Sequence, residues 1–194
     1  LFDFFKQKFA QVTNPPIDSI REEIITDTTV YLGIAGNVLE EKEENCRVLK
    51  INNPILTNID LMKIRHADLE GLKTHDISML YKKGTPLKDA IDGLYKQADK
   101  AHEEGAAILI LTDRGVDKDN VAIPSLLAVA ALETHLVRTR MNTAISIILE
   151  SGEPCDVHHF ATLMGFGASA INPYLAFDSI HELISEGQID KDYT

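Results

Sequence analysis

The chain has 194 residues, 44% hydrophobic and 25% charged, and its 30 acidic against 19 basic side chains give a formal net charge of -11. This length suits one domain with enough chain to bury a core. The negative charge repels nucleic-acid phosphates and anionic lipid, and no apolar run approaches the roughly 20 residues that cross a bilayer, so we expect neither nucleic acid nor a membrane as a partner.

The first 70 residues are expected to form an irregular N-terminal arm (1–70) that packs on the rest of the chain. The prolines, glycines and acidic runs of this part interrupt regular periodicity, and residues 30–50 in particular read as irregular. Short elements are still predicted from local apolar spacing and capping residues. These are a helix over 2–12, a helix over 18–25 capped by Asp18, a strand over 46–51, and a helix over 57–64 capped by Thr57 or Asn58.

The remaining residues, 71–194, alternate buried strand-like runs with amphipathic helices, as four consecutive strand–helix units. Such alternation with short connections predicts parallel strands joined by right-handed crossovers. The fold class is therefore α/β with a mainly parallel sheet, and the pattern leaves open a degenerate half-barrel and an open doubly wound sheet. The strands are expected over 74–81, 106–112, 143–149 and 168–171, and the helices over 86–104, 123–140, 157–164 and 178–186.

Polar residues follow several of these predicted strands, and in both architectures the carboxyl ends of the strands gather on one face. The candidate site positions there are Asp113, Arg114, Glu150, Ser151 and Asn172. In one interpretation the two acids form a carboxylate pair and the arginine clamps an anion, as in an independent small-molecule enzyme or binding domain. In the other, which we favour, the acids cap turns through backbone N–H groups and the arginine neutralises one of them.

Other kinds of site have little support. The glycines at 165 and 167 lack the third glycine of a dinucleotide fingerprint and follow a helix rather than a strand. Adjacent histidines on a helix point about 100° apart, so His158 and His159 rarely share a metal. Cys155 lies near a predicted helix N-terminus but has no identifiable orienting partner, so packing in the core or at a cap is favoured over nucleophilic catalysis. We predict no catalytic, cofactor-binding or metal-binding residue.

The two cysteines, Cys46 and Cys155, lie far apart in a chain without a secretory signal. This usage indicates free thiols in a reducing compartment. We predict no disulfide and a cytoplasmic location. Because the sequence opens at Leu1 rather than at a methionine, we also expect it to be part of a longer polypeptide.

A series of motifs runs in order through nearly the whole chain. They are Thr13-Asn-Pro-Pro-Ile-Asp18, Ile20-Arg-Glu22, Asn53-Pro-Ile-Leu-Thr-Asn58, Leu111-Thr-Asp-Arg-Gly-Val-Asp-Lys-Asp119, Ile123-Pro-Ser-Leu-Leu127, His135-Leu-Val-Arg138, Glu150-Ser-Gly-Glu153, Val157-His-His-Phe160 and Gly167-Ala-Ser-Ala-Ile-Asn-Pro-Tyr-Leu-Ala176. This series resembles the central domain of glutamate synthase, in its large (alpha) subunit.

The resemblance implies a role inside a large oxidoreductase of glutamate biosynthesis and ammonia assimilation. That family makes glutamate from glutamine and 2-oxoglutarate: an amidotransferase domain releases ammonia, which reaches an FMN domain through a tunnel. The resemblance implies FMN and an iron–sulfur cluster for the parent enzyme, none of them in this domain, and the amidotransferase and FMN domains as partners. In agreement, Leu1 is no nucleophile, and two cysteines cannot supply three cluster ligands.

We therefore expect a non-catalytic connecting domain that acts as an interdomain scaffold with an α/β architecture. The predicted aromatic helix between Phe2 and Phe9, and the arm as far as residue 70, are hypothesised to be its docking surfaces for neighbouring domains. Exposed apolar side chains on the arm are the structural feature that this hypothesis requires.

Overall fold

The computed structural model describes residues 4, 6, 18–34, 36, 37, 39–67 and 69–190. The helix expected over 2–12 lies outside these residues, apart from Phe4 and Lys6. Within the described part of the chain, no helix combines the length and the apolar character needed to cross a membrane.

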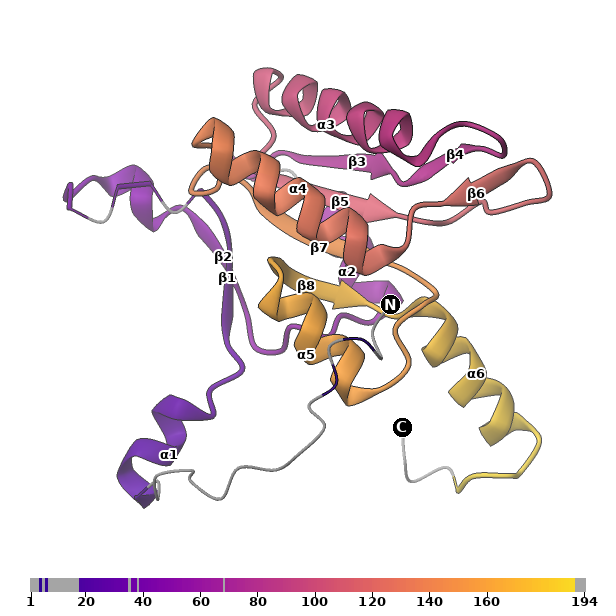
Figure 1. The fold of residues 1–194 in the computed structure, drawn as a ribbon. Coiled ribbons are helices and arrows are strands. Elements are labelled where there is room, and N and C mark those ends of the chain that lie inside the picture. The colour runs from indigo at the N-terminus through magenta and orange to yellow at the C-terminus, as the bar shows by residue number, and fades with distance from the viewer. Residues whose placement is uncertain are drawn as a thin grey trace.

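The centre of the molecule is a four-stranded parallel sheet whose strands alternate with helices (Figure 1). The strands, in sheet order, are β3 (Thr74–Ser78), β5 (Ile108–Thr112), β7 (Ser146–Glu150) and β8 (Ala168–Asn172), and the helices are α3 (Leu87–Glu103), α4 (Ser125–Thr139), α5 (Val157–Gly165) and α6 (Tyr174–Ser185). The predicted α/β class, with four strand–helix units on a parallel sheet, is confirmed.

Three helices, α3, α4 and α5, cover one face of this sheet. Side chains alternate along β5, so that Leu109 and Leu111 pack in the same core cluster as Leu94 of α3 and Leu132 of α4. Because the strands follow one another in chain order across the sheet, right-handed crossovers place successive helices on the same side. The sequence left open a half-barrel and a doubly wound sheet. Strands in chain order with these helices on one side are the arrangement found in the wall of a half-barrel.

The N-terminal arm covers the opposite face of the sheet. Ile108 and Ile110 of β5 point to this side and pack in a second core cluster with Leu61 and Ile64. Both faces of the sheet are therefore covered, which explains why the strands read as uninterrupted apolar runs rather than as alternating ones. The arm elements are α1 (Ser19–Ile25), β1 (Val30–Gly33), the 3-10 turn η2 (Glu43–Cys46), β2 (Val48–Ile51) and α2 (Asn58–Arg65).

The arm also occupies the outer edge of β8. Ile55 forms a parallel bridge with Ile171; the Leu56 backbone N–H donates to the Ile171 carbonyl, and the Ile171 N–H donates to the Pro54 carbonyl, both at 2.8 Å. These bonds use the groups through which a further strand would pair. Within the described residues the sheet is open and does not close into a barrel.

Some local elements differ from the prediction. Residues 30–50 contain the antiparallel pair β1–β2 rather than only irregular chain. The strand expected over 74–81 is split after Ser78: its second half, β4 (Leu80–Lys82), leaves the main sheet and pairs antiparallel with β6 (Asn120–Ala122), which was not predicted. In addition, α6 begins four residues before the predicted start.

The capping residues read from the sequence are correct where the structure describes them. The Asp18 side chain accepts hydrogen bonds from the N–H groups of Ile20 and Arg21, and Thr57 accepts from Asp60. Each cap satisfies donors that lack a partner in the first helical turn. These caps fix where the short helices of the arm begin.

Candidate functional site at the carboxyl edge of the sheet

Four polar residues form a row across the carboxyl ends of the strands. Ser78 pairs in register with Thr112, Thr112 with Glu150, and Glu150 with Asn172. Since aligned residues on neighbouring strands share a face, the row points to the side covered by the arm. It therefore lies next to α2 rather than next to α3, α4 and α5.

Glu150 is the charged residue of this row, and its side chain is only 4% exposed. Its Oε2 accepts a hydrogen bond from Nη2 of Arg65 at 2.7 Å, and its Oε1 accepts from Nε of Arg114 at 2.6 Å. Burial raises the pKa of Glu150, but the hydrogen bonds from Arg114, Arg65 and Thr112 outweigh it and hold the pKa below its usual value. The carboxylate is therefore ionised and bound on both oxygens.

Arg65, the last residue of α2, reaches the cluster from the arm. Its Nε also donates to Oδ1 of Asp76 on β3, at 3.0 Å. Desolvation lowers the pKa of Arg65, yet the bonds to Glu150 and Asp76 outweigh that effect and raise it. One guanidinium thus connects α2 to two strands of the sheet.

Asp113, directly after β5, holds the loop that follows the next strand. Its Oδ2 accepts from Ser151 Oγ at 2.6 Å and from the Gly152 N–H at 3.0 Å, and its Oδ1 accepts from the Tyr174 hydroxyl at 2.9 Å. Burial and this bond to Asp113 raise the pKa of Tyr174 to about 12. The Arg114 guanidinium carbon lies 3.9 Å from the centre of the Tyr174 ring, a cation–π distance.

Asn172, at the end of β8, is fully buried and binds the start of α2. Its side-chain Nδ2 donates to the Leu56 carbonyl at 2.9 Å and to Asn58 Oδ1 at 3.0 Å. Both partners are acceptors, which fixes the orientation of the amide. The Oδ1 of Asn172 is buried without a hydrogen-bond partner among the described residues.

The structure brings the five predicted positions into one strand-end cluster, which we define as Asp113, Arg114, Glu150, Ser151 and Asn172 together with Arg65 and Tyr174. Each oxygen of the two carboxylates receives at least one internal donor. Another acid nearby binds the start of a helix: Glu153 Oε2 accepts the Ser125 N–H at the start of α4 at 2.7 Å. Asp113 accepts a backbone N–H, as a turn-capping acid does, but from the loop after β7 rather than from its own turn. Glu150 instead accepts its hydrogen bonds from the side chains of Arg65 and Arg114.

Sequence reasoning missed two members of the cluster. Tyr174 belongs to the Asn172-Pro173-Tyr174 turn, and its position at a strand end was a usable signal. For Arg65 the sequence contains no comparable signal, because only the tertiary fold places the end of α2 over β7. The predicted interpretation, with Arg114 alone as the neutralising cation, was therefore incomplete.

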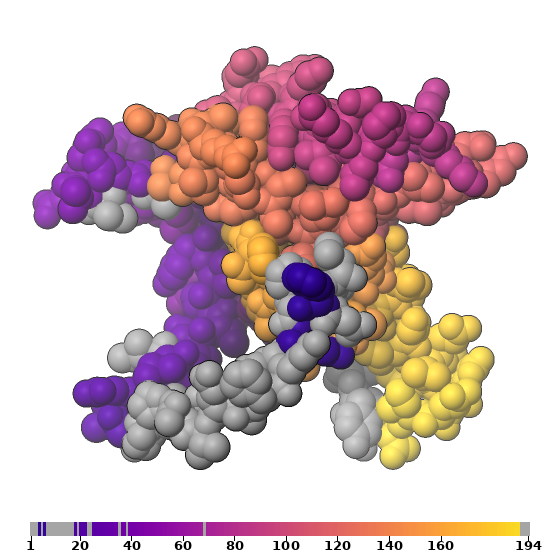
Figure 2. Space-filling view, viewed as in Figure 1, coloured from indigo at the N-terminus to yellow at the C-terminus, as the bar shows by residue number. Residues whose placement is uncertain are grey.

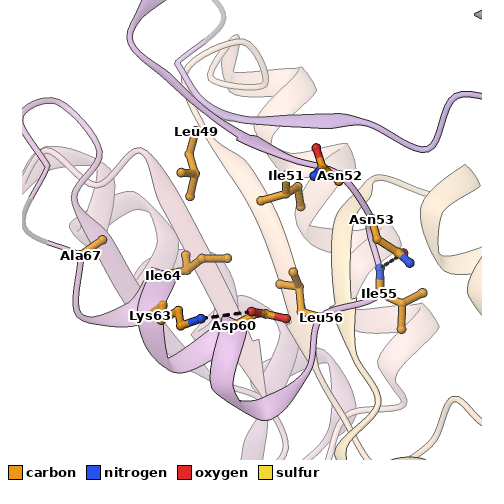
Figure 3. Close-up of a pocket in the computed structure, with 10 residues that line it drawn as sticks. All are labelled: Leu49, Ile51, Asn52, Asn53, Ile55, Leu56, Asp60, Lys63, Ile64 and Ala67. Atoms are coloured by element: carbon orange, nitrogen blue, oxygen red, sulfur yellow. Dashed lines mark hydrogen bonds and ion pairs between the residues drawn. The ribbon is translucent and has the colours of Figure 1, made fainter. Parts of the chain in front are cut away.

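A groove of about 470 Å³ opens on the arm side of the molecule, between β2 and α2 (Figure 3). Leu49 and Ile51 line it from the strand, Leu56 from the connecting loop and Ile64 from the helix. At its rim, Lys63 and Asp60 form an ion pair at 3.8 Å. The groove is mainly apolar and separate from the strand-end cluster.

The remaining chemically reactive groups do not assemble into a metal centre. Among the described residues, no group of three or more His, Cys, Asp and Glu side chains is placed to hold an ion. Cys46 and Cys155 are both exposed free thiols, so of the two expected placements of Cys155 the core is wrong. Cys155 directly precedes Asp156, the N-cap of α5, and its Sγ lies 3.7 Å from His159 Nδ1. Two cysteines also do not fit the three thiolate ligands of the iron–sulfur cluster expected for the parent enzyme.

Comparison with known proteins identifies the family of the chain. The family model for the glutamate synthase central domain matches residues 1–194. The chain is 44% identical over 193 residues to the glutamate synthase (NADPH) large chain of Bacillus subtilis, covering all of this chain and 13% of that protein. It is 38% identical over 206 residues to ferredoxin-dependent glutamate synthase 2 of Synechocystis, covering 98% of this chain and 13% of that protein.

A eukaryotic relative gives the same result. The glutamate synthase (NADH) of Schizosaccharomyces pombe is 36% identical over 191 residues, covering 96% of this chain and 9% of that protein. The chain thus spans between 9% and 13% of the length of these relatives. The matches run from end to end of the chain, and the chain therefore belongs to the glutamate synthase central domain family.

Proposed function

We propose that the chain is a non-catalytic connecting domain of a glutamate synthase, which positions the glutamine amidotransferase and FMN domains of an enzyme that makes glutamate from glutamine and 2-oxoglutarate. The observation that carries the proposal is the internal saturation of the strand-end cluster. At the edge where α/β proteins usually bind substrates, Glu150 and Asp113 bind Arg65, Arg114, Ser151 and Tyr174 instead.

These contacts link parts of the chain that would otherwise be free to move relative to one another. Arg65 attaches the arm to the sheet, and Tyr174 attaches the start of α6 to the loop after β5. A connecting domain must hold its docking surfaces in a fixed relative orientation. Multiply bonded ion pairs with a buried carboxylate suit that role because they are directional as well as attractive.

The arm carries exposed apolar side chains of the kind that a docking surface requires. Among them are Tyr31 at 59% exposed, Leu39 at 89%, Ile59 at 66% and Met62 at 56%. The last two lie on α2, the helix that forms one wall of the apolar groove. We propose that these exposed side chains of the arm contact a neighbouring domain, with their burial as the driving force.

The same proposal places the cofactors of the enzyme in other parts of the large chain. FMN and the iron–sulfur cluster would be bound outside this segment, and the enzyme would act in the cytoplasm. The 194-residue chain is then expected to show no thermal shift with FMN, 2-oxoglutarate or glutamine. A shift with one of them that Glu150→Gln abolishes would instead support a small-molecule site in the strand-end cluster.

The positioning role predicts a specific kinetic defect in the full-length enzyme. Met62→Glu places a charge on the proposed arm interface and should reduce glutamine-dependent glutamate formation about tenfold, while glutaminase activity and ammonia-dependent glutamate formation persist. Lys96→Glu, which adds the same side chain to an exposed position of α3, is the matched control. Equal loss of all three activities, or no loss with Met62→Glu, would contradict the proposal.

A further inference from the structure

Helix α6 differs from the other three helices of the strand–helix units. Leu94 of α3, Leu132 of α4 and Leu163 of α5 are buried against the sheet, whereas no residue of α6 is fully buried in the described part of the chain. Leu175 is 52% and Ile180 41% exposed. In Figures 1 and 2 this yellow helix stands out from the body of the molecule.

The sequence of α6 is nevertheless that of a helix with a buried face. At 100° per residue, five of its apolar side chains fall within an arc of about 120° and Leu175 lies outside it. Most of the opposite side is polar, a distribution typical of helices that pack on a core. The polar residue Asp178 lies about 160° around the helix from Ile180. The apolar stripe consists of Ala176, Phe177, Ile180, Leu183 and Ile184.

The fold explains why the described strands offer no sheet face to this stripe. In repeated strand–helix units, a helix packs between its own strand and the next. The edge of β8 where a next strand would pair is already bonded to the segment 54–56. The stripe of α6 therefore has no continuing sheet on which to pack within the described residues.

The direction of α6 is fixed at its first residue. The Tyr174 hydroxyl donates to Asp113 at 2.9 Å, and the Arg114 guanidinium stacks on the ring of Tyr174. A Cβ on Gly152 would lie 3.1 Å from the Tyr174 hydroxyl oxygen, so this loop approaches the ring closely. The helix is thus presented at a set angle by the strand-end cluster.

We propose that α6 docks, through this apolar stripe, into an apolar groove elsewhere in the same glutamate synthase large chain. The matched relatives are long enough to supply that groove, since the segment covers only 13% of the first of them. The chain has a net charge of -11, so the complementary groove has basic residues on its rim. This inference rests on the proposed connecting function and assigns it a second, separate contact.

Site-specific photocrosslinking in the full-length large chain tests the docking of α6. A benzophenone amino acid placed at Ile180, on the stripe, should crosslink to a peptide of the large chain outside this segment, with at least tenfold higher yield than the same group placed at Asp178. The acceptor peptide, identified by mass spectrometry, is expected to be apolar with neighbouring Lys or Arg. Mixing isotopically light and heavy enzyme distinguishes a crosslink within one chain from one between two chains.

Three results would overturn this inference. They are crosslinks only between light and heavy chains, which would make α6 a contact between copies; acceptor sites only within the 194 residues; and equal yields from the two positions. The kinetic test with Met62→Glu is independent of these outcomes. If Met62→Glu shows the expected kinetic defect but Ile180 gives no crosslink, the docking of α6 is rejected and the connecting function of the arm is kept. If Ile180 crosslinks as expected but Met62→Glu shows no defect, the function of the arm is rejected and the α6 contact is kept.

Discussion

Arg65 and Glu150 are 85 positions apart in the chain, and their side chains meet at 2.7 Å between Nη2 and Oε2. The contact joins the last residue of α2 to the last residue of β7. Because Glu150 also accepts from Arg114, one buried carboxylate is held between two guanidinium groups. The arm and the sheet are thereby connected through an ion pair whose acidic member has little access to water.

Glu150→Gln is expected to lower the free energy of unfolding by about 1.5 kcal/mol, because it removes charge-assisted hydrogen bonds from two arginines that keep access to water. Urea denaturation at pH 7 measures this. The exposed Glu103→Gln on α3 is the control and should change the stability by less than about 0.5 kcal/mol. Equal, small effects of both substitutions would show that the pair contributes nothing to stability.

The depressed pKa of Glu150 also predicts a difference in acid stability. A carboxyl group whose pKa is lower in the folded state stabilises the protein above its ordinary pKa of 4.5, and that contribution is lost as the pH falls below this value. The wild-type chain should therefore lose stability more steeply below pH 4.5 than Glu150→Gln does. Parallel curves of unfolding free energy against pH for the two proteins would contradict the assignment.

The raised pKa of Tyr174 predicts a loss of stability as the pH rises, whereas the lowered pKa of Glu150 predicts one as the pH falls. The pKa of Tyr174 is raised from 10.0 to about 12, so its contribution to stability is fully present below pH 10 and is lost as the pH rises from 10 to 12. Tyr174→Phe should cost about 1 kcal/mol at pH 8, where the hydrogen bond to Asp113 is intact. This difference between the two proteins should shrink or reverse above pH 10; a difference that stays constant would refute the prediction.

Gly167 and Gly165 allow the cost of adding a Cβ to be compared at a strained and at an open position of the backbone. Gly167 has a φ of +118°, and a Cβ there would lie 2.7 Å from Cγ of Glu133. Gly167→Ala should therefore destabilise the chain by about 2 kcal/mol or more, through backbone strain and overlap with α4. Gly165→Ala, where a Cβ meets nothing within 4 Å, should be neutral or stabilising by up to about 1 kcal/mol. Thermal unfolding of the two variants measures the contrast.

The fold class and the five strand-end positions were predictable because they depend on local patterns. Apolar runs such as Ile108–Leu111 that alternate with helices are typical of parallel strands covered on both faces, and the carboxyl ends of such strands gather at one edge of the sheet. Helix starts were predictable where a short polar side chain such as Asp18 or Thr57 supplies the cap. The split after Ser78 was not, because β4 leaves the sheet to pair with β6, far along the sequence.

The sequence by itself therefore determined the alternation of strands and helices, the edge on which Asp113, Glu150 and Asn172 meet, and the resemblance to the glutamate synthase central domain. Only the tertiary structure decided that α2 crosses the opposite face, that Arg65 reaches Glu150, and that segment 54–56 closes the edge of β8. The physical reason is the separation along the chain over which each effect acts. Periodicity and capping act between residues a few positions apart, whereas these pairings depend on which distant surfaces become neighbours when both faces of the sheet are buried.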